Sequence, residues 1–192
     1  MSVIRAFIAI SVSEEIYGRL DNIIFELKER LPDSPLRWVP TRNIHLTIKF
    51  LGNVSEANLE VLKNTLQREI SSNPSFEISV GRFGAFPSVN RPRVLWVGME
   101  APKQLFIIQA GVENLTTRLG YPKEERPLSP HLTLARVARN ASPQEVRSIS
   151  QTISGYEVGF LGAFRVGEIH LYRSDLQSSG AVYTRLFSVR LQ

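Results

Sequence analysis

The sequences IHLTIKF at residues 44–50 and PHLTLAR at residues 130–136 contain the same His-Leu-Thr triplet. The chain has 192 residues and three histidines, so two of the three open this triplet. Side chains on a β-strand alternate between two faces, so each histidine shares a face with the threonine two positions on, about 6.6 Å along the strand. The leucines point the other way, into a core. Each triplet therefore predicts a strand that presents an imidazole and a hydroxyl together.

The surrounding pattern repeats in each half of the chain and predicts an α+β fold. A helical stripe precedes each His-Leu-Thr strand, and a polar turn and a second amphipathic helix follow it. Helices are expected over residues 16–31, 59–70, 105–119 and 146–153. Strands are expected over residues 3–12, 38–51, 76–86, 92–99, at the second triplet, and over 156–165, 168–173 and 181–191.

The spacing of the two triplets favours a duplicated half-domain. The two histidines lie 131 − 45 = 86 positions apart, which is too long for a solenoid repeat. We expect residues 1–192 to form a single domain built from two pseudo-symmetric lobes. Each lobe is predicted to be an antiparallel sheet backed by helices. Equivalent strands would then face each other across a central cleft that carries both motifs.

Terminal residues of three helices also follow known capping patterns. Ser13 precedes the first stripe and is expected to cap it. Ser142, Pro143 and Glu145 match a capping box with proline at the first helical position. Gly120 stands where the third helix should end. These signals place the helix boundaries independently of the hydrophobic stripes.

Composition limits the class of protein. A hydrophobic fraction of 43% is typical of a globular chain, and the absence of cysteine excludes disulfides and thiolate metal sites. No stretch approaches the roughly 20 apolar residues of a membrane span, and the apolar start turns acidic too early for a signal peptide. We therefore expect a cytoplasmic protein. A net charge of +5 favours phosphate-bearing partners without requiring them.

The doubled triplet suits phosphoryl transfer by general acid and base. Two opposed strands would place His45, His131, Thr47 and Thr133 around one phosphoryl group. Histidine titrates at about pH 6.5, so one imidazole can accept a proton while the other donates one, each role contributing about 10²–10⁴-fold in rate. The threonine hydroxyls can donate to the non-bridging oxygens. A single His-x-Thr would most often be structural, but two copies in a repeated frame favour a site.

The same residues predict chemistry without a metal or another cofactor. The motifs contain no carboxylate beside the histidines, and two imidazoles alone make a poor zinc or magnesium site. A cysteine nucleophile is excluded by composition, and no Gly-x-Ser-x-Gly elbow is present.

The pair HLTIKFLG and PHLTLAR resembles the motifs of the two-histidine (2H) phosphoesterases. Within them it is most similar to the bacterial and archaeal RNA 2′,3′-cyclic phosphodiesterases, also called 2′-5′ RNA ligases. The likeness spans nearly the whole chain and includes, in order, RAFIAI, RW, GAFPS, PRVLWVG and LYRSDLQSSGAVYTRL. It implies metal-independent hydrolysis of RNA or nucleoside 2′,3′-cyclic phosphate ends to a 2′-phosphate.

The resemblance also implies roles for individual residues. His45 would protonate the leaving ribose oxygen and His131 would activate water, although pseudo-symmetry permits the reverse. Both threonines would hold the phosphate. Arg136 matches a phosphate-binding arginine, but strict alternation puts it on the face opposite His131, so the strand must end, twist or bulge there. Phe86 matches an aromatic position near the nucleoside, where stacking competes with a simple core role.

Other interpretations stay open. The main activity could instead be 2′-5′ RNA ligation or 2′-5′ phosphodiester hydrolysis, because the same acid-base pair serves each reaction. A non-catalytic module that binds RNA ends is a further alternative. We expect a monomer whose partners are RNA or nucleotide ends, tRNA fragments among them. By alternation Lys49 shares the strand face of His45 and could meet phosphate, but it is interpreted as a solvated lysine. His170 is interpreted as a surface or structural histidine.

Overall fold

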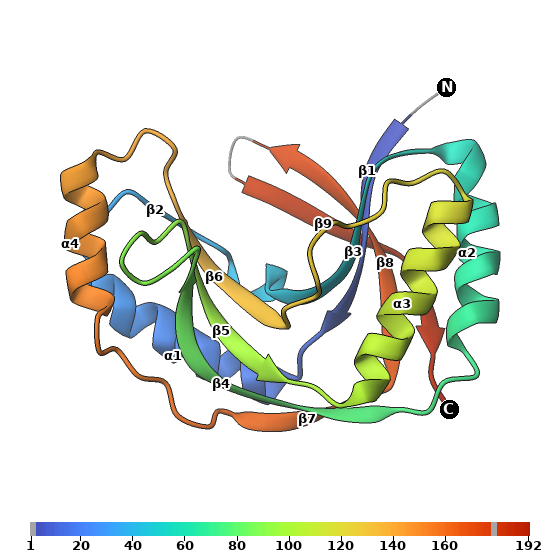
Figure 1. The fold of residues 1–192 in the computed structure, drawn as a ribbon, viewed down its shortest axis with the longest axis horizontal. Coiled ribbons are helices and arrows are strands. Elements are labelled where there is room, and N and C mark those ends of the chain that lie inside the picture. The colour runs from blue at the N-terminus through green and yellow to red at the C-terminus, as the bar shows by residue number, and fades with distance from the viewer. Residues whose placement is uncertain (1–2, 178–179) are drawn as a thin grey trace.

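The computed structural model describes residues 3–177 and 180–192 (Figure 1). The elements in chain order are β1 (Val3–Ser11), α1 (Glu14–Arg30), β2 (Leu36–Trp38), the 3₁₀ turn η1 (Thr41–Asn43), β3 (His45–Ser55), α2 (Glu56–Ile70), β4 (Phe76–Phe86), β5 (Val94–Glu100), α3 (Lys103–Arg118), β6 (His131–Val137), α4 (Pro143–Ile153), β7 (Gly162–Val166), β8 (Glu168–Gln177) and β9 (Gly180–Arg190).

The strands form two antiparallel sheets, which confirms the predicted α+β fold. One sheet has the order β3-β1-β8-β9 and the other β2-β6-β5-β4-β7. Figure 1 shows α2 and α3 side by side along the four-stranded sheet, while α1 and α4 lie with the five-stranded sheet. The first motif therefore begins an edge strand of one sheet, and the second motif lies in the other.

The two lobes do not coincide with the two halves of the chain. Strand β4 comes from the first half but pairs with β5 and β7 in the five-stranded sheet. Strand β8 comes from the second half but pairs with β1 in the four-stranded sheet. Each half thus contributes strands to both lobes. As a result, neither lobe can form from one half alone.

The core joins the lobes. Buried hydrophobic residues from both sheets and from α1, α2 and α3 form one continuous cluster. A smaller cluster forms where Ile149 and Ile153 of α4 pack near Leu95 and Ala135 on the back of the five-stranded sheet. The helices thus bury the sheet faces that point away from the histidines, and the opposite faces remain available for a site.

The predicted caps are present. The Ser13 hydroxyl accepts a hydrogen bond from the Ile16 amide at 3.4 Å. Ser142 and Glu145 form the reciprocal capping box of α4. Gly120 follows the end of α3 with a φ of 89°, the left-handed region that glycine adopts most easily. Among the described helices, none combines the length and apolar character needed to cross a membrane.

Two strand predictions were wrong in extent. The segment expected as one strand over 38–51 is split into β2, η1 and β3, because the chain passes there from one sheet to the other. Pro40, which has no amide hydrogen to donate to a ladder, begins the turn as its carbonyl accepts from Asn43. In the strand expected over 156–165, only Gly162–Val166 pairs with β4 as a strand.

Candidate active site

A cavity of about 610 Å³ lies between β3 of one sheet and β6 of the other. It is lined by all six residues that the sequence singled out: His45, Thr47, Phe86, His131, Thr133 and Arg136. Side chains 86 positions apart in sequence thus converge on one space. The walls also include Phe50, Tyr183, Leu128 and Ser129.

The two motifs enter the cavity in the same way. His45 is the first residue of β3, and His131 is the first residue of β6. In each triplet the leucine is buried, while the histidine and threonine on either side of it are only partly buried. This alternation places each imidazole and its neighbouring hydroxyl on the cavity face, as a strand requires.

A bulge in β6 brings Arg136 to the same face as His131. Leu95 pairs with Ala135 and Trp96 pairs with Thr133, so Leu134 is an extra residue without a partner on β5. Leu134 and Ala135 are both buried, and Arg136 beyond them is exposed and lines the cavity. An extra residue inverts the side-chain alternation from that point on. Of the three possibilities that the sequence left open here, an end, a twist or a bulge, the structure shows the bulge.

Strand β3 contains an equivalent bulge. Ile8 pairs with Lys49 and Ala9 pairs with Thr47, so Ile48 is the extra residue. Beyond it Phe50 lines the cavity with 60% of its surface exposed. Phe50 therefore occupies in the first motif the place that Arg136 has in the second. In the sequence, only the alignment of HLTIKF with HLTLAR indicates that Phe50 and Arg136 are equivalent. Phe50 was not predicted as a site residue.

The same bulge explains why the interpretation of Lys49 was wrong. Its side chain is 1% exposed, and its ammonium group lies 2.8 Å from the Glu113 carboxylate of α3. Ile48 and Lys49 are consecutive buried residues, so the bulge turns Lys49 toward α3 and the core, although it remains among the residues that line the cavity. Simple alternation, which assumes no bulge, predicts the opposite.

The His45 imidazole is fixed by one hydrogen bond and two aromatic rings. Its Nδ1 lies 2.7 Å from the carbonyl oxygen of Asn43. A carbonyl only accepts, so Nδ1 carries the hydrogen and Nε2 is the nitrogen available to a ligand. The ring stacks on Phe7 at 4.7 Å and meets Tyr183 edge-on at 5.4 Å. Tyr183, from β9, is a cavity residue that the motifs did not reveal.

His131 is held by an equivalent backbone contact. Its Nδ1 lies 2.7 Å from the carbonyl oxygen of Ser129, again two residues earlier. Its ring meets Phe86 edge-on, with centroids 4.9 Å apart and planes at 88°. Phe86 therefore contacts a motif histidine directly while it lines the cavity. In both motifs the backbone carbonyl binds Nδ1, so Nε2 is the ring nitrogen available to a ligand.

Burial lowers the pKa of both imidazoles below the usual 6.5. For His45, burial is the largest cause, the carbonyl of Asn43 opposes it, and Arg136 and His131 lower the pKa further. For His131, burial again acts first, the carbonyl of Ser129 opposes it, and Arg136 adds to the lowering. Both imidazoles therefore favour the neutral form at pH 7. A bound anion would favour the charged form of either ring.

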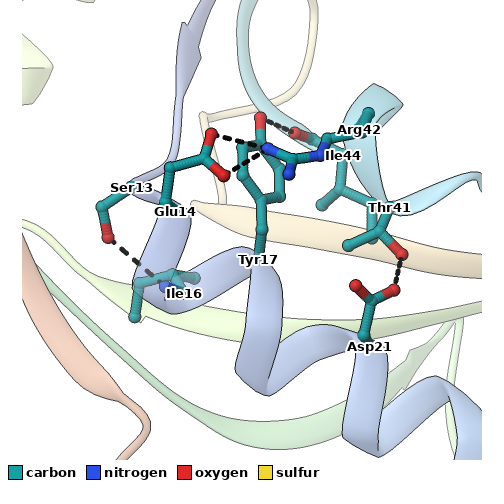
Figure 2. Close-up of polar contacts among 8 residues, drawn as sticks. All are labelled: Ser13, Glu14, Ile16, Tyr17, Asp21, Thr41, Arg42 and Ile44. Atoms are coloured by element: carbon teal, nitrogen blue, oxygen red, sulfur yellow. Dashed lines mark hydrogen bonds and ion pairs between the residues drawn. The ribbon is translucent and has the colours of Figure 1, made fainter.

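Helix α1 holds the turn that precedes His45 (Figure 2). The Tyr17 hydroxyl donates to the Ile44 carbonyl at 3.1 Å. The Arg42 guanidinium pairs with the Glu14 carboxylate, and the Thr41 hydroxyl donates to Asp21. These contacts fix η1, and with it the Asn43 carbonyl that orients the first imidazole.

The third histidine has a structural environment, as the sequence analysis allowed. His170 is 6% exposed on β8, and its Nδ1 lies 2.8 Å from the Ser188 hydroxyl oxygen. One of its two ring nitrogens is therefore used within the four-stranded sheet. The cavity is lined by the other two histidines.

The chain is similar to known proteins over its whole length. The family profile described as "LigT like Phosphoesterase" matches twice, at residues 10–96 and 97–183. The chain is 31% identical over 188 residues to the RNA 2′,3′-cyclic phosphodiesterase of Methanothermobacter thermautotrophicus, covering 98% of this chain and 99% of that protein. It is 33% identical to the protein of the same name from Aquifex aeolicus, covering 96% and 95%.

A solved structure shares the architecture. The crystal structure of Escherichia coli LigT complexed with 3′-AMP superposes with a TM-score of 0.79 at 27% identity, covering 100% of this chain and 99% of that one. The two profile matches meet between residues 96 and 97, so each contains one His-Leu-Thr motif. The duplication inferred from the spacing of the histidines is thus also visible in the family profile.

Proposed function

The chain belongs to the LigT-like phosphoesterases, and we propose that it is an RNA 2′,3′-cyclic phosphodiesterase that opens the cyclic phosphate to a 2′-phosphate. The observation that carries this proposal is the pair of imidazoles in one cavity, each with Nδ1 bonded to a backbone carbonyl and Nε2 free. Two relatives that are 31% and 33% identical to this chain are named RNA 2′,3′-cyclic phosphodiesterase. The paired histidines supply the acid and base that such a reaction needs.

The proposed reaction uses one histidine on each side of the phosphorus. His131 takes a proton from water as its oxygen bonds to phosphorus. The bond from phosphorus to the ribose 3′-oxygen breaks, and His45 donates its proton to that oxygen. The product keeps the phosphate on the 2′-oxygen. Because the two motifs are near-equivalent in geometry, the direction rests on the family resemblance.

Three further side chains are proposed to hold the phosphoryl group. Thr47 and Thr133 would donate hydroxyl hydrogens to the non-bridging oxygens. Arg136 would pair with the same oxygens through its forked guanidinium, which suits a tetrahedral anion better than a point charge does. Their shared place on the cavity lining supports this arrangement. These three side chains would also stabilise the negative charge that develops on the oxygens as the phosphorus becomes five-coordinate.

The nucleoside is proposed to lie against the aromatic part of the cavity. Phe86 and the exposed Phe50 offer flat apolar surfaces on which a base can stack. RNA and nucleotide ends are the substrates that this combination fits, and tRNA fragments are proposed among them. We also propose that the whole chain, residues 1–192, acts as a monomer in the cytoplasm, since one copy supplies both motifs to the cavity.

The test is turnover of a nucleoside 2′,3′-cyclic phosphate in excess chelator, with the product's phosphate position determined by phosphorus NMR. A 2′-phosphate is expected. His45→Ala and His131→Ala should each lose about 10²–10⁴-fold in kcat while the circular dichroism spectrum is retained. Full activity in either variant would contradict the pairing. A panel with 2′-5′-linked oligonucleotides and RNA ends separates hydrolysis from ligation, and salt-sensitive RNA binding without product would indicate a binding module.

A further inference from the structure

The segment between α3 and β6 forms one wall of the cavity. We call residues 121–130 the approach loop; they contain neither helix nor strand. Glu124, Arg126, Pro127, Leu128 and Ser129 of this loop line the cavity. The Ser129 carbonyl is also the group that binds Nδ1 of His131. The position of this loop therefore decides both the shape of the wall and the orientation of one imidazole.

The first part of the approach loop, around Pro122 and Glu124, is bound to a buried ion pair. The Lys49 ammonium donates to the Glu113 carboxylate at 2.8 Å and to the Pro122 carbonyl at 2.5 Å. The same oxygen of Glu113 accepts the Glu124 amide at 2.9 Å. The side chains of Lys49 and Glu113 are 1% and 8% exposed. One charge pair thus joins β3, α3 and two backbone groups of the loop, the Pro122 carbonyl and the Glu124 amide.

The remaining anchors lie at the ends of the loop. The Tyr121 amide donates to the Thr116 carbonyl at 3.0 Å, and the Met99 amide donates to the Pro130 carbonyl at 3.2 Å. Most side chains between these ends are exposed, so apolar burial contributes little there. A loop with few buried apolar groups opens easily unless polar contacts hold it. The pair provides such contacts next to the cavity wall.

We propose that Lys49 and Glu113 are positioning residues that hold the approach loop, and through Ser129 the His131 imidazole, in the geometry needed for turnover. Lys49 lies two residues after Thr47 on the strand of the first motif. The first motif's strand therefore supports the second motif's histidine. The kinetic part of this inference rests on the proposed function; the part that concerns the loop does not.

A purely structural role predicts a different result. Breaking one half of a buried ion pair destabilises a protein, whereas replacing both partners by apolar residues is often neutral for stability. If the pair only fills the core, the double replacement should therefore restore both stability and activity. If it positions the loop, the double replacement should restore stability alone, because methionine and leucine cannot bind Pro122 or Glu124.

The decisive variant is Lys49→Met with Glu113→Leu. Lys63→Met with Glu60→Leu on α2 is the matched control, since that pair has the same 2.8 Å separation but lies on the surface. We expect the melting temperature of the Lys49/Glu113 double variant to be close to that of the unsubstituted protein. Hydrogen exchange of the amides of residues 121–130 should be at least about tenfold faster in this variant. Its kcat should fall about 10–100-fold with a smaller change in KM, as expected for a misplaced catalytic group. The control should change none of these.

A second substitution tests the loop without touching the pair. Glu124→Pro removes the amide hydrogen that Glu113 accepts, and Glu124→Ala keeps it. Both variants lose the Glu124 side chain from the cavity wall, so the comparison is between them: the proline variant should show faster amide exchange in the loop and a several-fold lower kcat than the alanine variant, with melting temperature preserved in both. Glu113→Gln keeps an oxygen acceptor for both Lys49 and Glu124, so the folded variant should retain most of kcat, while the melting temperature falls because the buried Lys49 loses its counter-charge.

The inference is overturned if the folded Lys49/Glu113 double variant retains kcat within about twofold of the unsubstituted protein, or if loop exchange is unchanged. Should that double variant fail to fold, equal behaviour of the proline and alanine variants at position 124 would overturn it instead. Failure of the proposed function is a separate result. In that case the unsubstituted protein itself gives no turnover, and the exchange measurements still decide the role of the pair.

Discussion

The two motifs orient their imidazoles by the same backbone contact, but different interactions hold the segment that provides this contact in each motif. Each imidazole binds a carbonyl two residues earlier at 2.7 Å. The first carbonyl belongs to the short turn η1, which α1 holds through Tyr17 and through surface contacts. The second belongs to the longer approach loop, which a buried ion pair holds. The two motifs thus share the contact that orients the imidazole and differ in what lies behind it.

The bulges show a second difference. Both strands have an extra residue directly after the triplet. In each strand the residue two positions after the extra one therefore lies on the cavity face. That residue is Phe50 in one strand and Arg136 in the other. A charged fork and an aromatic face thus stand at equivalent positions across a pseudo-symmetric cavity. A nucleoside cyclic phosphate carries an anionic group and a flat base, so under the proposed function this asymmetry would favour one direction of binding.

The largest effect that would sharpen this comparison is expected at Arg136. Arg136→Met should lower kcat about 10²–10³-fold, because the phosphoryl oxygens lose a charged partner as their charge grows. Arg136→Lys should recover part of this loss, since it keeps the charge but not the fork. Steady-state kinetics with a cyclic mononucleotide is the measurement. A loss of less than about threefold in the methionine variant would mean that Arg136 does not bind the reacting phosphate.

The sequence could predict the parts of the site that depend on local pattern. The triplets, the helical stripes and the Ser13 and Ser142 caps are all properties of neighbouring residues, and each is present in the structure. The conflict between alternation and the contact that the resemblance implies for Arg136 also showed that the strand must end, twist or bulge there. These inferences needed no knowledge of which strands pair.

The features of the site and fold that could not be predicted from the sequence depend on pairing between distant segments. An extra residue in β3 is defined only against β1, so neither Phe50 in the cavity nor Lys49 in the core could be read from alternation. The exchange of β4 and β8 between lobes is likewise a property of the sheets and not of either half. Tyr183 reaches His45 only because β9 joins the first motif's sheet.

The pH dependence of kcat/KM should show how closely the two motifs are coupled. One imidazole must be charged in the free protein, and burial lowers the pKa of both below about 6.5. The charged form is therefore lost as pH rises through that lowered pKa, and kcat/KM should fall about tenfold per pH unit above it. On the acid side, protonation of the base lowers kcat/KM in turn. The optimum should thus lie on the acid side of pH 6.5.

Arg136 provides the control for this profile. It lowers the pKa of both histidines, so Arg136→Met should move the alkaline limb to higher pH while it lowers the maximum. The apparent values belong to the pair, because His131 also lowers the pKa of His45. A flat profile between pH 5 and 8 would contradict acid-base catalysis by these two rings.

A smaller and different effect is expected at Phe50. Phe50→Ala should raise KM for a cyclic mononucleotide about fivefold, near the lower end of what stacking on one base contributes, and leave kcat nearly unchanged. Inhibition by inorganic phosphate should not change, because phosphate has no base to stack. Equal effects of the alanine variant on phosphate inhibition and on KM would show that Phe50 acts on the anion side, against the asymmetry described above.

The smallest effect tests the support of the first motif. Arg42 and Glu14 pair on the surface, with side chains 71% and 77% exposed, and exposed ion pairs contribute little. Arg42→Ala should therefore change kcat/KM by less than about twofold. Tyr17→Phe, which removes the buried hydrogen bond to the Ile44 carbonyl, should cost several-fold more. If instead Arg42→Ala lowers kcat/KM as much as replacement of Lys49 and Glu113 does, the first motif also depends on an ion pair, and the contrast between the two supports does not hold.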